Sequence, residues 1–175
     1  AVRNLDDKPE NMAPLFETIL DAIPAPEGDP DGDTQVLIST IDYNEYVGRI
    51  GVGKVERGTI SVNQELMLLN HHDPDKHERV KISKLYEFDG LNKVEVKSAT
   101  IGAIVAISGI ADIHIGDTLC AGDNPESIPF QKISEPTISM NFLVNDSPLA
   151  GQEGKYITSR HLRDRLYREL NTDVS

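Results

Sequence analysis

The chain has 175 residues, 38% of them hydrophobic, which is enough to bury one core of ordinary size together with an appendage. A formal net charge of −12 and a sequence pI of about 4.7 argue against a protein that coats itself with nucleic acid over its whole surface. Cys120 is the only cysteine, so an intrachain disulfide is excluded and a reducing, cytoplasmic location is expected. No apolar run approaches the roughly 20 residues of a membrane-spanning helix, so we expect no membrane partner.

Residues 1–32 are expected to be a helix followed by a linker. After Pro14, the apolar residues Leu15, Ile19 and Ile23 recur at helical spacing over residues 11–23. The five Pro and Gly residues between positions 24 and 32 exclude a regular element there. Residues 1–33 hold nine acids against two bases, so this part is strongly acidic.

Residues 33–130 are predicted to form an all-β module. Short β-branched runs alternate with Gly, Asn and Asp, and the run TIGAIVAISGI is apolar on both faces, as in a strand that is covered on both sides. A closed barrel accounts for this pattern most simply. The glycines at positions 48, 51, 53 and 58 are expected to serve the bends and bulges of a barrel.

Residues 131–175 are predicted to form a strand over 137–145, a glycine-bearing loop over 151–154 and an amphipathic helix. Leu162, Leu166 and Leu170 form the apolar stripe of that helix. One strand and one helix cannot close a core, so we expect the fold to continue beyond residue 175. The chain also begins with Ala1 and ends on an uncapped helical pattern, and we therefore expect it to be a piece of a longer protein.

Three short patterns imitate functional motifs without satisfying their chemistry. Residues 48–55 match a phosphate loop up to its glycine-lysine pair, but Val55 replaces the Ser or Thr that binds magnesium, and the flanks indicate two strands. We therefore predict no GTP site and no enzyme activity in this chain. Asp29, Asp31 and Asp33 open like a calcium loop, but Thr34 replaces the required glycine.

The third pattern is a histidine cluster in a predicted polar connection between two strands, where an exposed loop is favoured over a metal site; it comprises His71, His72 and His77, with Asp73 and Asp75. His161 has no catalytic partner at a recognisable spacing. We predict no catalytic residue, metal or cofactor in this chain.

Basic residues remain as candidates for binding nucleic acid. Arg49, Lys54, Arg57, Lys81 and Lys84 lie on predicted barrel strands, where they are either phosphate contacts on a rim or ordinary outward-facing residues. Residues 155–170 carry five bases against two acids, and their four arginines cannot all share the leucine stripe. That helix is the better candidate for nucleic-acid contact.

Several segments resemble a known family. YVGRIGVGKVERGTI, with its Arg57-Gly58 hairpin, and the closing Gly116-Asp117-Thr118-Leu119 resemble the second domain of translational GTPases over about 90 residues. QVLISTIDYNEYVGRI, EPTISMNFLVNDSPLAGQEGKYITSRHLRDRL and PLFETILDAIPAP are similar to the BipA/TypA family. Together these segments span nearly the whole chain.

The resemblance implies an elongation-factor-type β-barrel, domain II, followed by an incomplete α+β ferredoxin-like unit, the start of domain III. GTP and Mg²⁺ would bind the absent GTPase domain, to which residues 1–32 would be attached, and further C-terminal domains would follow. The parent would hydrolyse GTP on the ribosome and act in stress or cold response and in ribosome assembly.

The resemblance further implies contact with small-subunit ribosomal RNA and with the subunit interface. The residues that match the hairpin pattern are Arg49, Lys54, Arg57 and Gly58. We extend the expected contact to Lys155, Arg160 and Arg163 in the third-domain loop and helix.

Two other classes of function stay open at this point. The chain could come from another ribosomal GTPase, of the LepA or elongation factor G type, and residues 136–170 would discriminate between these. The barrel could instead be a structural spacer or a protein-interaction module. A free-standing nucleotide enzyme is disfavoured by Val55.

Overall fold

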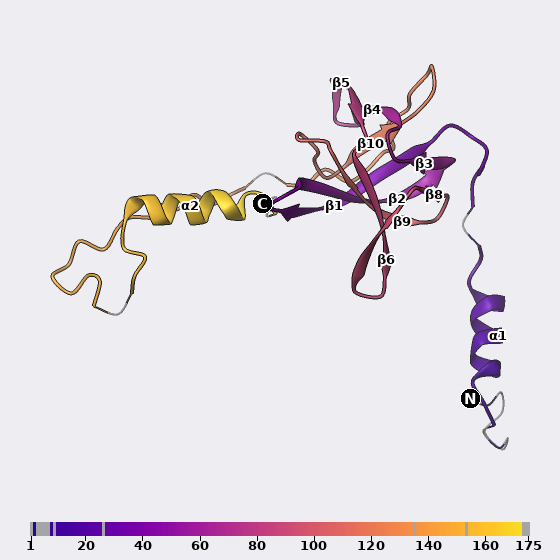
Figure 1. The fold of residues 1–175 in the computed structure, drawn as a ribbon, viewed down its shortest axis with the longest axis horizontal. Helices are drawn as coiled ribbons and strands as arrows, with labels where there is room; N and C mark the ends of the chain where they lie inside the picture. The colour runs from indigo at the N-terminus through magenta and orange to yellow at the C-terminus, as the bar shows by residue number, and fades with distance from the viewer. Residues whose placement is uncertain are drawn as a thin grey trace.

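The computed structural model describes residues 2, 8, 10–25, 27–134, 136–152 and 154–172. Over these residues two helices flank ten strands, and Figure 1 shows both helices projecting away from the strands, with the C-terminal end of α2 near β1. In chain order the elements are α1 (Ala13–Ala22), β1 (Gln35–Asn44), β2 (Gly48–Arg57), β3 (Thr59–Ser61), β4 (Glu65–Asn70), β5 (Asp73–Lys81), β6 (Lys84–Asp89), β7 (Asn92–Val96), β8 (Ser98–Thr100), β9 (Ile104–Ser108), β10 (Asp117–Cys120) and α2 (Ser159–Glu169). The prediction of a mainly β chain is confirmed.

The strands form a barrel. Eight of them pair antiparallel in the order β5-β4-β10-β1-β2-β9-β6-β7, and β3 pairs with β8. The segment after β3 reaches both edges of the large sheet, because Val62 N–H donates to Lys97 O at 3.0 Å and Asn63 N–H donates to Ile82 O at 2.9 Å. The β3–β8 pair thereby joins the edges that β5 and β7 would otherwise leave open.

Alternate residues of the strands point inward and build a single core, as the period of two in a strand requires. β9 is buried on both faces from Val105 to Ser108, as its apolar sequence predicts, although Ile104 is exposed. The inward residues of four strands include Val36 and Ile38, Leu66 and Leu68, Val80, and Val105 and Ile107, and Ile82 joins them from just beyond β5.

β1 and β2 form the longest pair and approach each other closely. Their register shifts between Ile38 and Thr40, opposite Gly53 and Val52. A Cβ atom added at Gly53 would lie 2.2 Å from the carbonyl oxygen of Leu37. The predicted bulge in this pair is therefore present, and the absence of a side chain at Gly53 makes it possible.

Both predicted helices are present, and neither buries a residue against the barrel. Pro14 lies in the first turn of α1. The Thr158 side-chain oxygen caps α2 by accepting a hydrogen bond from His161 N–H at 3.3 Å. Over the described residues, no helix combines the length and the hydropathy that crossing a bilayer requires.

Two local predictions are corrected by the structure. No strand forms within residues 136–152, where a strand over 137–145 was predicted; its backbone groups would need a neighbouring strand, and none lies there. The ferredoxin-like character of residues 131–175 stays a prediction. His77 belongs to β5 instead of a long polar connection, because only residues 71 and 72 separate β4 from β5.

After β10 the chain returns across the barrel wall, and we call residues 121–130 the strap. Gln35 Nε2 donates to Glu126 O at 2.9 Å, and Ile128 N–H donates to Thr118 Oγ1 at 3.0 Å. His72 Nε2 lies 2.8 Å from Phe130 O, and the two rings meet edge to face. These contacts accord with a barrel unit over 33–130, although the boundaries at 32 and 130 stay predictions.

Candidate nucleic-acid interface

The three cationic candidates of the barrel lie on one strand but not in one place. Arg49 is at the beginning of β2 and Arg57 at its end, eight positions further along the strand. At about 3.3 Å per residue this separation is roughly 26 Å. The structure therefore gives no single cationic rim formed by Arg49, Lys54 and Arg57, and each must be assessed by its own surroundings.

Lys54 is exposed, but an acid on the same strand accompanies its charge. Its Nζ lies 2.7 Å from Glu56 Oε2. Two further lysines of the barrel are compensated in the same way, Lys84 by Glu95 at 3.0 Å and Lys93 by Asp42. Each of these three barrel lysines therefore has an acidic side chain of the barrel as its counter-ion.

The last two of these pairs, Lys84–Glu95 and Lys93–Asp42, shift the pKa values of Lys84 and Asp42. The hydrogen bond from Lys93 lowers the pKa of the Asp42 carboxyl below its ordinary value. The hydrogen bond to Glu95, with the attraction between the two charges, raises the pKa of Lys84. The charged forms of Asp42 and Lys84 are therefore stabilised by their partners, which weakens the case for Lys84 and Lys93 as phosphate contacts.

Arg57 and Gly58 hold residues 29–33 to the barrel. Arg57 Nε donates to Asp33 O at 3.0 Å, and Gly58 N–H donates to Asp29 O at 2.9 Å. Gly58 has a φ of 69°, and a Cβ atom there would lie 2.3 Å from Gly32 O. This arrangement, which we call the linker clamp, explains the Arg-Gly pair by its contacts within the chain.

Replacing Gly58 by alanine is expected to lower the free energy of unfolding by at least about 2 kcal/mol, because backbone strain adds to the contact with Gly32. Gly90→Ala is the matched control, since Gly90 has a φ of 60° and a Cβ atom there meets nothing within 4 Å. Urea denaturation of both variants would measure the difference. Equal destabilisation by the two would show that the clamp does not need the close approach.

Arg49 differs from the other candidates. It is half-buried, pairs with Tyr43 across β1 and β2, and has no acidic partner at ion-pair distance among the described residues. The turn over residues 45–47 adjoins it. Arg49 therefore has an uncompensated guanidinium at the turn end of the β1–β2 hairpin.

The helix α2 approaches that same end of the barrel. Arg168 Nη2 lies 2.7 Å from Glu45 Oε1 in the hairpin turn, and Figure 1 shows the C-terminal end of α2 beside the β1–β2 hairpin. The structure thus places the C-terminal end of α2 at the hairpin turn near Arg49, whereas Lys155 and Arg160 lie at the other end of the helix and Arg57 lies at the opposite end of β2.

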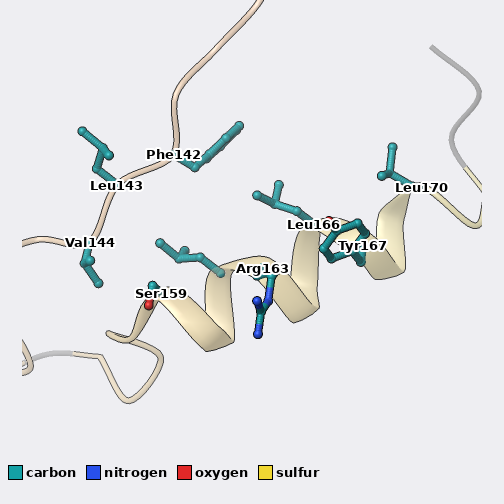
Figure 2. Close-up of a pocket in the computed structure, with 9 residues that line it drawn as sticks. Phe142, Leu143, Val144, Ser159, Arg163, Leu166, Tyr167 and Leu170 are labelled. Atoms are coloured by element: carbon teal, nitrogen blue, oxygen red, sulfur yellow. The ribbon is translucent and has the colours of Figure 1, made fainter.

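The three predicted residues around α2 are all exposed. Lys155 precedes the helix, and Glu153 of the predicted loop lies outside the described residues. Arg160 Nε lies 3.8 Å from Asp164 Oδ2, a weak contact between exposed groups. Figure 2 shows Arg163 pointing away from the side of the helix on which Leu166 and Phe142 lie. Arg49, Lys155, Arg160 and Arg163 together are called the composite basic surface below.

The apolar side of α2 faces residues 142–144 across an open pocket of about 480 Å³ (Figure 2). The residues of α2 that line it include Leu162, Leu166 and Leu170, the stripe predicted from the sequence. Over the described part of the chain, no three His, Cys, Asp or Glu side chains form a group that could hold a metal ion.

Sequence reasoning missed Tyr156. Its ring lies 5.5 Å from that of His161, at an interplanar angle of 82°. The tyrosine lies outside the helix and the histidine in its first turn, so helical periodicity does not relate them. No spacing signal in the sequence pairs these rings.

Comparisons with known proteins agree with this architecture. Residues 48–120 match the family model of elongation factor Tu domain 2. Two solved structures share the fold: a protein of Thermus thermophilus, at 23% identity and a TM-score of 0.54 over 72% of this chain and 18% of that one, and elongation factor SelB of Methanococcus maripaludis, at 20% identity and a TM-score of 0.51 over 65% and 23%.

Curated relatives extend the match beyond the barrel. Each is named large ribosomal subunit assembly factor BipA: the protein of Synechocystis is 48% identical over the whole chain, that of Bacillus subtilis 45% over 95% of it, and that of Escherichia coli K12 42% over 97%. The chain spans 27–29% of the length of these relatives. With the barrel, the matched domain and the identity along its whole length, the chain belongs to the BipA/TypA family of translational GTPases.

Proposed function

We propose that this chain is a ribosome-contacting, non-catalytic part of a BipA-type translational GTPase, in which the composite basic surface binds ribosomal RNA. The observation that carries the proposal is the contact between Glu45 and Arg168, which holds the C-terminal end of the exposed helix α2 at the hairpin turn near uncompensated Arg49. The name of the relatives, large ribosomal subunit assembly factor, supports the ribosome as the partner. The RNA would be that of the small subunit and of the subunit interface.

The parent protein supplies the chemistry in this proposal. Its GTPase domain would bind GTP with Mg²⁺ and hydrolyse it on the ribosome, in the cytoplasm, in the course of ribosome assembly and growth under stress or cold. The barrel would present Arg49 on a rigid strand pair, and α2 would add charges from outside the barrel. Rigid positioning reduces the entropy lost on binding.

Electrostatic binding of this kind has a measurable signature. Four phosphate contacts, one for each residue of the composite basic surface, give a slope of about −3 in a plot of log affinity against log salt concentration. Affinity for the ribosome would then fall by roughly 10- to 100-fold between about 50 and 200 mM salt through these contacts alone.

The test is co-sedimentation of the full-length parent protein with 70S ribosomes across a salt series. Changing the composite basic surface to glutamine at all four positions is expected to weaken binding by roughly tenfold or more and to flatten the salt slope. The matched control neutralises both members of three compensated pairs, Lys54 with Glu56, Lys84 with Glu95 and Lys93 with Asp42, so that the net charge does not change. The control is expected to stay within about twofold of the parent, because the compensated pairs add little net charge.

The same experiment tests the second candidate, a barrel that serves as a spacer or protein-interaction module. The compensated lysines favour that candidate, because they leave the β2–β9–β6 wall nearly neutral. Unchanged sedimentation of the four-residue variant would contradict the RNA-contact proposal and leave the spacer.

A further inference from the structure

The side of α2 that carries Arg165 and Arg168 contains a groove. Six residues line this groove of about 620 Å³: Tyr156, His161, Leu162, Asp164, Arg165 and Arg168. His161, Arg165 and Arg168 recur at intervals of four and three, so they share one face of the helix. We call it the aromatic-arginine groove.

The two rings of the groove are arranged to accept a further ring. Tyr156 and His161 meet edge to face, with centroids 5.5 Å apart and planes at 82°. An edge-to-face pair engages only one face of one ring, so the remaining faces stay open for stacking. The Tyr156 side chain is 79% exposed. Its ring therefore contributes little to the fold of the described chain.

The arginines of the groove are held by exposed acids. Arg165 pairs with Glu169 one turn along α2, and Arg168 pairs with Glu45 at 2.7 Å. Both guanidinium side chains remain about two-thirds exposed, at 65% and 67%. Exposed ion pairs contribute little to stability, so a phosphate can replace these carboxylates at small cost.

We infer that the aromatic-arginine groove binds an unpaired nucleotide of RNA, with its base stacked on Tyr156 or His161 and its phosphate bound by Arg165 and Arg168. This inference rests on the proposed function, because it names the RNA element that α2 would recognise. Bases within a duplex have their faces covered by neighbouring bases, whereas unpaired bases can stack on aromatic side chains and guanidinium planes.

The apolar side of the same helix does not suit this ligand. Phe142, Leu143 and Val144 line it together with the leucine stripe, and among its described lining residues the one cation is Arg163, which points away from Leu166 and Phe142. The aromatic-arginine groove combines open rings with two cations, and that combination matches the alternation of base and phosphate in a single strand.

The test measures binding of two fluorescein-labelled RNA probes to the full-length parent protein. One is a single-stranded, uridine-rich 12-mer, and the other is the duplex of that strand with its complement. Tyr156→Ala, with His161→Ala, is expected to weaken binding of the single strand by about 5- to 100-fold and to leave binding of the duplex unchanged. The single variant Tyr156→Phe, in which His161 is unchanged, keeps the aromatic ring and is expected to bind the single strand as the parent protein does.

Equal affinity of the parent and the double alanine variant for the single strand would overturn the inference, as would an equal loss for both probes. Neither substitution removes a lysine or an arginine, so the salt slope should stay that of the parent. A ring-dependent affinity for the single strand, together with unchanged ribosome sedimentation of the four-residue variant, would uphold the groove and reject the composite basic surface. If the four-residue variant no longer sediments with ribosomes, and single-strand binding does not depend on the rings, the composite basic surface is upheld and the groove is rejected.

Discussion

Replacing Asp117 by alanine is expected to lower the free energy of unfolding by about 3–5 kcal/mol, because it removes the acceptor of a buried ion pair. The Asp117 side chain is fully buried and accepts three hydrogen bonds. These come from Asn70 Nδ2 at 2.8 Å, from Lys76 Nζ at 3.0 Å and from His114 N–H at 2.8 Å. Without Asp117, an ammonium that is only 16% exposed loses its closest counter-ion.

Urea denaturation of this variant, beside Asp123→Ala, checks the prediction. Asp123 is exposed, and its removal is expected to change stability by no more than about 0.5 kcal/mol. Replacing both members of the pair, Asp117 by leucine and Lys76 by methionine, is expected to recover much of the loss, because no unpaired charge remains. A single Asp117→Ala variant as stable as the control would show that the ion pair does not stabilise the barrel.

Replacing Gly53 by alanine is expected to cost about 3 kcal/mol or more, although only one methyl group is added. The new Cβ atom would lie 2.2 Å from the Leu37 carbonyl oxygen and 3.2 Å from the Ile38 Cα atom. Both are backbone atoms of the paired strand, so β1 and β2 would have to separate, and overpacking of this kind has no cheap relaxation.

Gly154→Ala is the matched control, since a Cβ atom at Gly154 meets nothing within 4 Å. For a barrel of about this size, each kcal/mol lost at the midpoint lowers Tm by roughly 4–8 °C. Calorimetry of the two variants should therefore separate them by more than roughly 10 °C. Coincident transitions would mean that β1 and β2 can move apart without loss, against the tight pairing described above.

The barrel could be predicted from the sequence because its signals are local. Val36 with Ile38, and Leu66 with Leu68, alternate as strand residues with one buried face must. The helix over 159–169 was equally legible, since Leu162, Leu166 and Leu170 recur at intervals of four. Each of these patterns lies within a single strand or helix, so it can be recognised without knowing which other segments pack against that element.

The remainder depends on partners that are distant in the sequence. A strand over 137–145 needs a neighbour, and its β-branched residues alone do not provide one. The candidate site shows the same limit: Arg57 binds a main-chain carbonyl 24 residues away, which no composition or spacing reveals. The resemblance indicated which residues matter, and the contacts show that Arg57 and Gly58 have a structural reason to be there.

The linker clamp also limits how far the barrel and the preceding helix can separate. α1 ends at Ala22, and Asp29 is fixed to the barrel wall, so six residues act as the tether. Fully extended, about six residues span roughly 20 Å. Whatever unit contains α1 is therefore kept within this short distance of the Arg57 end of the barrel, where its effective concentration reaches the millimolar range. Even a weak contact between the two would then be occupied much of the time.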